Sequence, residues 1–375
     1  MEKSYHDQNL KYFYIFPCVL GCFIPTLTLQ LLFELPSERI LLKSIGTSIF
    51  LVGIFLLVTM KGLNLKNLMA SFVMTSFFYI FAFSSFLYDS SESLNHLLRA
   101  CLATLICYFF LEASKNDLKI ILNIVFVLLF LIALIGVLSI LFNFSNGEKF
   151  PILNIASTKS IVFEQNVYGI ATFFLLFICT RYKQIKYLGS IKYLVTLIGI
   201  VALLFSFYRT VYLCLMALLF INSSRKVFWL IFFSTLLFLY LIYFNNLELI
   251  SEIFKLEQIS NLTGRVEMYT LGWELFLENP IIGLSELSIP YYLQFTTFHN
   301  LFLDTLIFGG VIGLVLLIMS YMLLLQRLDI KHYTPLLLVL LPSLLNTFYI
   351  FGPNILGFSA AALIFSHQIE KENWK

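Results

Sequence analysis

Apolar segments recur along almost the whole chain, and most are long enough to cross a membrane. A helix needs about 20 mostly apolar residues to span the ~30 Å hydrocarbon core, and about twelve segments approach that length. Because lipid offers no hydrogen-bond partners to the backbone, such segments fold as α-helices. We predict an all-α, polytopic membrane protein. The predicted spans are 12–35, 40–60, 68–87, 94–112, 118–142, 165–181, 190–207, 209–222, 227–245, 299–325, 334–351 and 354–368.

The composition agrees with that fold class. Of 375 residues, 60% are hydrophobic and 12% are charged, which is about half the charged share of a soluble protein. The net charge of +3 is too small to favour nucleic acid as a partner, and no basic patch interleaved with aromatic residues accompanies it. The six cysteines fall in apolar runs without a C-x-x-C pair, so we predict packing residues rather than disulfides or zinc ligands. No Walker loop or dinucleotide fingerprint occurs, and neither a metal nor a cofactor is expected.

One polar connection, residues 246–298, is far longer than the usual link between helices. Its stretch NLTGRVEMYTLGWELFLENPIIG has a candidate N-cap at Thr263 and a stop at Asn279-Pro280. Between them, apolar side chains recur at helical spacing opposite three glutamates: Val266, Tyr269, Trp273 and Phe276 against Glu267, Glu274 and Glu278. This pattern predicts an amphipathic helix on the surface of the bundle. Residues 1–375 are thus expected to form a single membrane domain, with 246–298 as an external loop between the ninth and tenth helices.

Lysine and arginine are distributed unequally between alternate connections. Cytoplasmic loops of membrane proteins carry an excess of these residues, which predicts that both termini are cytoplasmic and that residues 246–298 are outside. The side assigned to the cytoplasm collects Lys61, Lys66, Lys115, Lys119, Arg181, Lys183, Lys186, Lys192, Arg225, Lys226, Arg327, Lys331, Lys371 and Lys375, whereas the other side keeps far fewer.

A few basic side chains do not follow this bias and fall near the outer ends of helices. Lys43, Arg99 and Arg209 lie close to such ends, and Arg265 lies in the first turn of the amphipathic helix. Snorkelling to lipid headgroups would account for Lys43 and Arg99. Arg209 stands in a polar break, SFYRT, and Arg265 opposes the dipole of its own helix. Snorkelling fits Arg209 less well than Lys43 and Arg99, and an anionic partner is the simplest explanation for Arg265.

The second half of the chain carries a series of short motifs. They are Glu164-Gln165-Asn166, Ser206-x-x-Arg209, Gly264-Arg265, Trp273, Asn279-Pro280-x-x-Gly283, His299-Asn300 and Gly309-Gly310-x-x-Gly313. Their order and spacing over residues 160–325 resemble the O-antigen ligase/polymerase superfamily, bacterial membrane enzymes that transfer glycans from a polyprenyl pyrophosphate carrier. Ser206-Phe207-Tyr208-Arg209 departs from the adjacent Ser-Arg of many members. A long outer loop between the ninth and tenth of about twelve helices matches the family architecture.

The resemblance implies roles for residues at the outer face of the bacterial inner membrane. Arginine binds phosphate oxygens through two parallel hydrogen bonds and stays charged, so Arg209 and Arg265 are predicted to bind and stabilise the leaving pyrophosphate. His299 is the predicted general base for the acceptor hydroxyl, with Glu164 and Asp304 as alternatives.

Other residues are expected to complete the site or to shape the helix that follows it. The predicted substrate-binding set also contains Arg99, Asn166 and Asn300. Asn300 and Asp304, one turn apart, are expected to cap and orient the start of the tenth helix. Gly309 and Gly313 are expected to permit close helix packing.

Three activities are compatible with these residues. The first, which we favour because the outer insert is modest, is a polymerase that joins lipid-linked repeat units into O-antigen or capsular polysaccharide. The second is a ligase that transfers the finished glycan to the lipid A-core of lipopolysaccharide. The third is a secondary transporter or flippase, which is disfavoured because the charged residues gather at the outer edge rather than at the bilayer midplane. The implied partners are the polyprenyl-pyrophosphate-linked glycan, the bilayer, and a flippase and a chain-length regulator of the same pathway.

Overall fold

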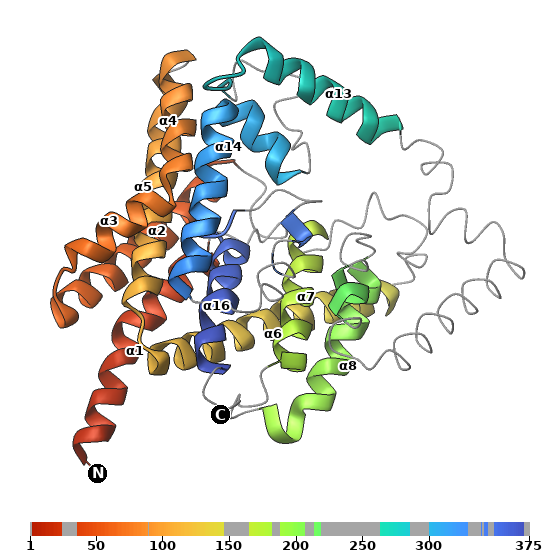
Figure 1. The fold of residues 1–375 in the computed structure, drawn as a ribbon. Helices are drawn as coiled ribbons and strands as arrows, with labels where there is room; N and C mark the ends of the chain where they lie inside the picture. The colour runs from red at the N-terminus through yellow and green to blue at the C-terminus, as the bar shows by residue number, and fades with distance from the viewer. Residues whose placement is uncertain are drawn as a thin grey trace, which may run out of the picture.

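The computed structural model describes residues 2–24, 36–88, 90–145, 165–181, 188–206, 214–218, 263–285, 300–328, 339, 341–343 and 349–370. Throughout these residues the regular elements are helices, with no strand among them (Figure 1). The prediction of an all-α protein is confirmed for this part of the chain. The helices are α1 (Glu2–Phe23), α2 (Pro36–Lys61), α3 (Leu65–Met74), α4 (Ser76–Tyr88), α5 (Ser90–Glu112), α6 (Lys115–Ser145), α7 (Gln165–Arg181), α8 (Leu188–Ser206), α13 (Thr263–Glu278), α14 (Leu301–Leu328) and α16 (Ile355–Glu370).

Several helices are long and apolar enough to cross a membrane. Among the described residues these are Leu41–Lys61, Ser93–Glu112, Lys115–Leu138 and Leu301–Arg327, and the bent pair α3 and α4 adds a fifth candidate. The protein is therefore an integral membrane protein. The predicted span 227–245, and most of the spans 209–222 and 334–351, lie outside the described residues. The count of twelve helices, and the position of the long loop between the ninth and tenth, stay predictions.

The predicted span 68–87 is not one continuous helix. The chain breaks at Thr75, and α3 and α4 meet there at a bend of 60°. Thr75 Oγ1 donates to the Ser71 carbonyl at 2.8 Å and also lies 2.8 Å from Thr104 Oγ1 of α5. Hydroxyl side chains that bond to the backbone compete with regular helix geometry and bend helices. Ser320 of α14 donates to the carbonyl of Met74, the last residue before the break.

The predicted span 334–351 also ends differently from the expectation. Residues 350–351 form a turn, in which Phe351 has a φ of 68°. Gly352 N donates to the Tyr349 carbonyl at 2.9 Å, and Asn354 Oδ1 then accepts from Gly357 N at 2.8 Å in the first turn of α16. A side-chain cap of this kind defines where a helix begins. Because residues 349–351 are Tyr-Ile-Phe, a hydropathy profile gives no sign of this turn.

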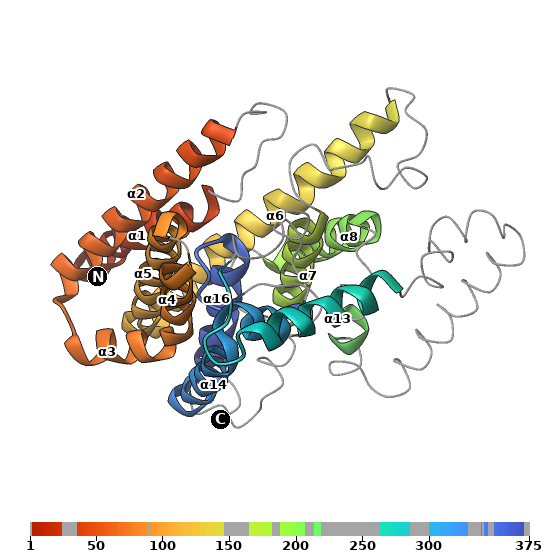
Figure 2. The same cartoon turned by 90° about the horizontal axis from the view of Figure 1, so that it is seen from above.

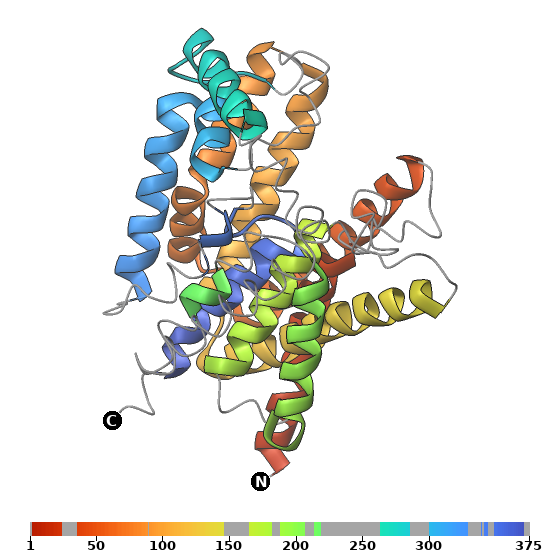
Figure 3. The same cartoon turned by 90° about the vertical axis from the view of Figure 1, so that its right-hand side faces the viewer.

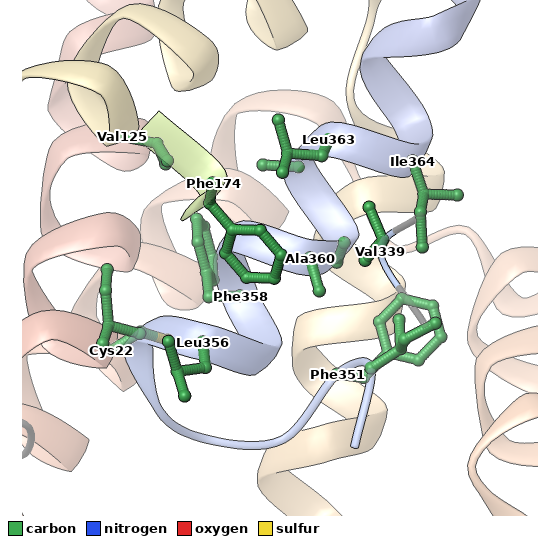
Figure 4. Close-up of a cluster of buried hydrophobic side chains, with 14 of the residues drawn as sticks. Cys22, Val125, Phe174, Val339, Phe351, Leu356, Phe358, Ala360, Leu363 and Ile364 are labelled. Carbon is green, nitrogen blue, oxygen red and sulfur yellow. The ribbon is translucent and has the colours of Figure 1, made fainter. Parts of the chain in front are cut away.

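The largest buried cluster contains residues of every labelled helix except α13, and Figure 4 shows the part of it where α16 packs against α6 and α7. Phe174 of α7, Phe358 of α16 and Val125 of α6 are all fully buried there. From Tyr168 to Cys179 every residue of α7 is buried, which explains why this helix is apolar on all sides. The six cysteines are free, and all are buried except Cys101 on α5. Packing therefore accounts for five of them, as predicted.

The two ends of the molecule carry different elements. α13 crosses one end, above α14 in Figures 1 and 3, and extends from α14 toward α8 when the molecule is seen from above (Figure 2). The start of α1 and the end of α16 lie at the opposite end (Figure 1). α5 connects the two ends, because it begins after α4 beside α13 and runs toward the opposite end.

Charged and amide side chains join the helices at the end away from α13. The Asp117 carboxylate is 1% exposed and binds two lysines, with Lys61 Nζ 2.7 Å from Oδ2 and Lys11 Nζ 3.4 Å from Oδ1. Asn67 Nδ2 donates to Glu112 Oε1 at 2.6 Å, and Asn67 Oδ1 accepts from Arg327. The group ties together α1, α2, α3, α5, α6 and α14. We call it the basic end: Lys11, Lys61, Asn67, Glu112, Asp117 and Arg327.

Candidate functional site

A helix is present at the predicted position as α13, which ends at Glu278 directly before Asn279-Pro280. Its buried side agrees with the prediction at Phe276 but not at Trp273. Leu275 and Phe276 are 4% and 7% exposed, whereas Trp273 is 51% exposed. The partly buried Met268 and Leu271 complete the stripe that faces the bundle. The prediction placed Trp273 on that side because it left out Leu271 and Leu275, which shift the centre of the apolar stripe.

A tight turn follows α13 and is fixed to α4. Gly283 N donates to the Asn279 carbonyl at 2.9 Å, and Gly283 has a φ of 82°. Tyr88, the last residue of α4, donates from its hydroxyl to Asn279 Oδ1 at 2.6 Å. The turn therefore needs glycine at its end, because other residues rarely adopt a positive φ. The Asn-Pro-x-x-Gly motif is thus a structural turn with a side-chain tie to the bundle.

The predicted span 299–325 is interrupted where this turn meets α14. Gly310 has φ 60° and ψ −163°, which is not helical, and α14 consists of two helical halves on either side of it. In an uninterrupted helix Val311 N would donate to the Ile307 carbonyl. Here that carbonyl accepts from Leu284 N at 2.7 Å instead. The break thus leaves backbone groups that need other partners.

The turn after α13 supplies those partners. Val311 N donates to the Pro280 carbonyl at 2.8 Å, and Ile312 N donates to the Ile281 carbonyl at 3.2 Å. Unsatisfied backbone groups are costly inside a membrane protein, so the turn and the break stabilise each other. We call this arrangement the clasp: residues 279–284 of the turn with residues 307–312 of α14.

Two glycines make the clasp possible. A Cβ on Gly310 would lie 2.3 Å from the backbone carbon and oxygen of Ile281. A Cβ on Gly283 would lie 2.6 Å from the backbone of residues 307–309. The expectation for Gly309 is confirmed, since its Cβ would meet the Phe81 ring of α4 at 2.7 Å, but Gly313 makes only ordinary contacts. The prediction missed the roles of Gly283 and Gly310, although both are visible in their motifs.

The expected cap at the start of α14 is confirmed for Asn300. Asn300 Oδ1 accepts from Phe302 N at 3.0 Å and from Leu303 N at 3.2 Å. Asp304, one turn further on, is 2% exposed, and its neighbour Thr305 lies 3.5 Å from the Tyr349 hydroxyl through Oγ1. The first half of α14 therefore presents a buried carboxylate close to the turn before α16. Among the described residues, no group of three or more His, Cys, Asp or Glu side chains could hold a metal ion.

The structure places the predicted site residues on different elements. Arg99 is an exposed residue of α5, Asn166 is the second residue of α7, and Arg265 lies in the first turn of α13. Arg209, His299 and Glu164 lie outside the described residues. No side-chain contact between predicted site residues is described, but the clasp joins the helix that contains Arg265 to the helix that starts after Asn300.

Comparison with known proteins bears on this same region. Residues 189–318 match the family model described as O-antigen ligase. The resemblance to the O-antigen ligase/polymerase superfamily is confirmed. The matched segment begins in α8, contains α13 and the clasp, and ends in the second half of α14. This O-antigen ligase segment supports a membrane glycosyltransferase of the ligase or polymerase type that acts on lipid-linked glycans. Searches of curated proteins and of solved structures found no match.

Proposed function

We propose that the protein polymerises oligosaccharide repeat units linked to polyprenyl pyrophosphate, on the outer face of the bacterial cytoplasmic membrane. The products would be O-antigen or capsular polysaccharide. The observation that carries the proposal is the match of residues 189–318 to the O-antigen ligase family model. The clasp lies in this segment and joins α13 to α14. Arg265, a predicted site residue, belongs to α13, and His299, the predicted general base, directly precedes Asn300 and α14.

The distribution of charge supports the proposed orientation. Lys11, Lys61 and Arg327 gather at the basic end, and α5, which has 23 residues, separates that end from α13. A helix of this length spans about 35 Å, which is enough to cross the hydrocarbon core. With the lysine-rich side in the cytoplasm, α13 and the clasp face the outside, where the glycan carrier presents its phosphates.

The proposed chemistry is a glycosyl transfer with a pyrophosphate leaving group. His299 takes the proton of the acceptor hydroxyl as its oxygen forms a bond to the anomeric carbon. The bond between that carbon and the carrier phosphate breaks, and its electron pair leaves with the pyrophosphate. Arg209 and Arg265 offset the charge that develops there. Arg99, Asn166 and Asn300 complete the proposed substrate contacts, with the Asn300 amide nitrogen as the donor because its oxygen caps α14.

A ligase is the second candidate, since the matching family model carries that description. The two activities share the donor and differ in the acceptor, so the glycans of a deletion strain separate them on a gel. Loss of the long ladder with a single repeat unit still attached supports the polymerase. A bare core together with accumulated carrier-linked chains supports the ligase and contradicts the polymerase. An unchanged glycan pattern would contradict both, and complementation with the wild-type gene is the control.

Reporter fusions test the proposed orientation. Fusions after Lys66, Lys186 and Lys331 should report the cytoplasm, and a fusion near Glu257 should report the outside, because the basic residues are expected to stay inside. A cytoplasmic signal at Glu257 would separate Arg265 and His299 from the carrier phosphates. The proposed mechanism would then be wrong.

A further inference from the structure

The clasp fixes the position of α13 relative to α14 through backbone hydrogen bonds. Three main-chain hydrogen bonds, of 2.7, 2.8 and 3.2 Å, cross between residues 279–284 and residues 307–312. Backbone atoms have no rotamers, so such bonds set the distance and angle between two segments more tightly than contacts between long side chains do. A straight α14 would satisfy the same backbone groups internally. The chain instead breaks the helix and satisfies these groups from the turn.

We infer that the clasp is a positioning device for the glycosyl transfer. It holds α13, with Arg265 in its first turn, in a fixed relation to the first half of α14, which begins directly after His299-Asn300. Pro280, Gly283 and Gly310 are its positioning residues, and Tyr88 and Asn279 anchor it to the bundle. This inference rests on the proposed function, since it concerns the distance between the pyrophosphate-binding group and the general base.

Side chains brace the same two segments. Leu275 and Phe276 of α13 form one buried cluster with Leu284 of the turn and Ile307 of α14. This cluster lies on the first half of α14, before the break at Gly310. α13 therefore contacts α14 on the half that leads back to Asn300, and the clasp sets the hinge point between them.

The tie to α4 gives the clasp a fixed base. Tyr88 ends α4, and α4 packs on α14 at Gly309, whose backbone closely approaches the Phe81 ring. The turn, α4 and α14 thus meet at one point. Movement of α13 away from α14 would have to break the hydrogen bond from Tyr88 to Asn279 as well as the three backbone bonds.

A pair of glycine substitutions tests the inference in purified protein reconstituted into vesicles. The donor is carrier-linked repeat unit extracted from the deletion strain, and binding is measured with glycan-free polyprenyl pyrophosphate. Gly310→Ala places a Cβ against the Ile281 backbone, so the clasp must open. We expect turnover to fall about 10²-fold, a loss that a displacement of about 1 Å can cause, with the Kd for polyprenyl pyrophosphate changed by less than about threefold. The matched control, Gly313→Ala, meets only ordinary contacts and should turn over at the wild-type rate.

A second set of variants covers the case in which Gly310→Ala does not fold. Asn279→Ala removes the acceptor of the Tyr88 hydroxyl and should lower turnover about tenfold, as expected for one lost hydrogen bond. Asn279→Asp keeps an acceptor oxygen and should retain turnover within about twofold. Tyr88→Phe should match Asn279→Ala, and the double variant should be no slower than either single one, because both remove the same contact. Turnover is compared at matched amounts of folded protein. If the contact between Tyr88 and Asn279 only stabilised the fold, Asn279→Ala and Asn279→Asp would then turn over equally fast.

The outcomes separate the inference from the proposed function. If the wild-type protein elongates no glycan and transfers none to an acceptor, the proposed function fails, and the inference fails with it. If the wild type is active and folded Gly310→Ala turns over equally fast, only the inference is overturned. The inference is also overturned if Asn279→Asp is as slow as Asn279→Ala, or if the variants lose affinity for polyprenyl pyrophosphate while turnover is unchanged.

Discussion

At the basic end, side chains join the helices, whereas at the clasp the backbone does. Asp117 binds Lys61 and Lys11 through flexible side chains that come from three different helices. The clasp uses main-chain N–H and C=O groups and depends on glycines with positive φ. Side-chain ion pairs can adjust to small helix movements, whereas the main-chain bonds of the clasp leave its two segments less freedom to move. The difference indicates that the basic end stabilises the helix bundle, whereas the clasp orients α13 relative to α14.

The surroundings explain why each end uses its own kind of bond. Lys11 and Lys61 are 28% and 26% exposed, so their charges keep part of their contact with water or headgroups. The basic end can therefore hold ions without full desolvation. The clasp lies within an apolar helix, where a backbone group without a partner is costly. Pairing the break with the turn satisfies the backbone without adding a charge.

The largest effect that would test this comparison is expected from His299→Ala. If the side that carries α13 performs the chemistry, turnover should fall about 10²–10⁴-fold, the usual loss for a general base. Polyprenyl pyrophosphate should bind as before, because the arginines are unchanged, and thermal stability should stay the same. The measurement compares elongation rate with binding in reconstituted protein. Lys43→Ala on α2 is the control, and turnover at the wild-type rate for His299→Ala would move the base to Glu164 or Asp304.

A smaller effect, on stability and not on turnover, is expected from Asp117→Asn. The substitution leaves Lys61 and Lys11 beside a neutral amide in a buried site. Loss of this charge pairing should lower the free energy of unfolding by about 2 kcal/mol, less than for a fully buried pair because both lysines are partly exposed. Turnover per folded molecule should not change. Unfolding in detergent micelles measures the first quantity, and elongation at matched folded protein measures the second.

The control for this experiment lies on the same helix. Lys119 of α6 is exposed, and Lys119→Ala should change the free energy of unfolding by less than about 0.5 kcal/mol, as for most surface substitutions. The comparison between the two ends would be wrong if Asp117→Asn slowed elongation without loss of stability. The basic end would then act on the chemistry from a distance.

Hydropathy predicts where most helices lie but not where they break. The predicted 165–181 coincides with α7, and 94–112 and 354–368 differ from α5 and α16 by a few residues. The breaks at Thr75 and Gly310 fall inside apolar runs, so an average over a span-length window conceals them. Gly309 and Gly310 are adjacent in the sequence, and only the contact with the turn after α13 decides that Gly310 is the one that leaves the helix.

The candidate site was predictable in its motifs and not in their contacts. Asn279-Pro280 marks the end of α13, as the sequence indicates, and Asn300 caps α14. The pairing of the Asn-Pro-x-x-Gly turn with the glycines of α14 is a tertiary contact, and nothing in either motif specifies its partner. The contacts of the basic end are even harder to predict from the sequence. Asn67, Asp117 and Arg327 follow no common spacing, and they come together only when α3, α6 and α14 pack.

The smallest effect is expected at the break between α3 and α4, where a side chain of α14, and not its backbone, binds the carbonyl beside the break. Ser320 of α14 donates to the Met74 carbonyl, whereas the bend itself is supported locally by Thr75 and Ser71. Single hydrogen bonds between membrane helices contribute about 0.6 kcal/mol on average, so Ser320→Ala should lower the free energy of unfolding by less than about 1 kcal/mol and leave turnover unchanged. Ser48→Ala is the control, since its hydroxyl bonds to the Ser44 carbonyl of its own helix. A loss as large as that of Asp117→Asn would mean that contact with α14 is essential to this bend, and that fixing a helix break through a second segment is not confined to the α13 end.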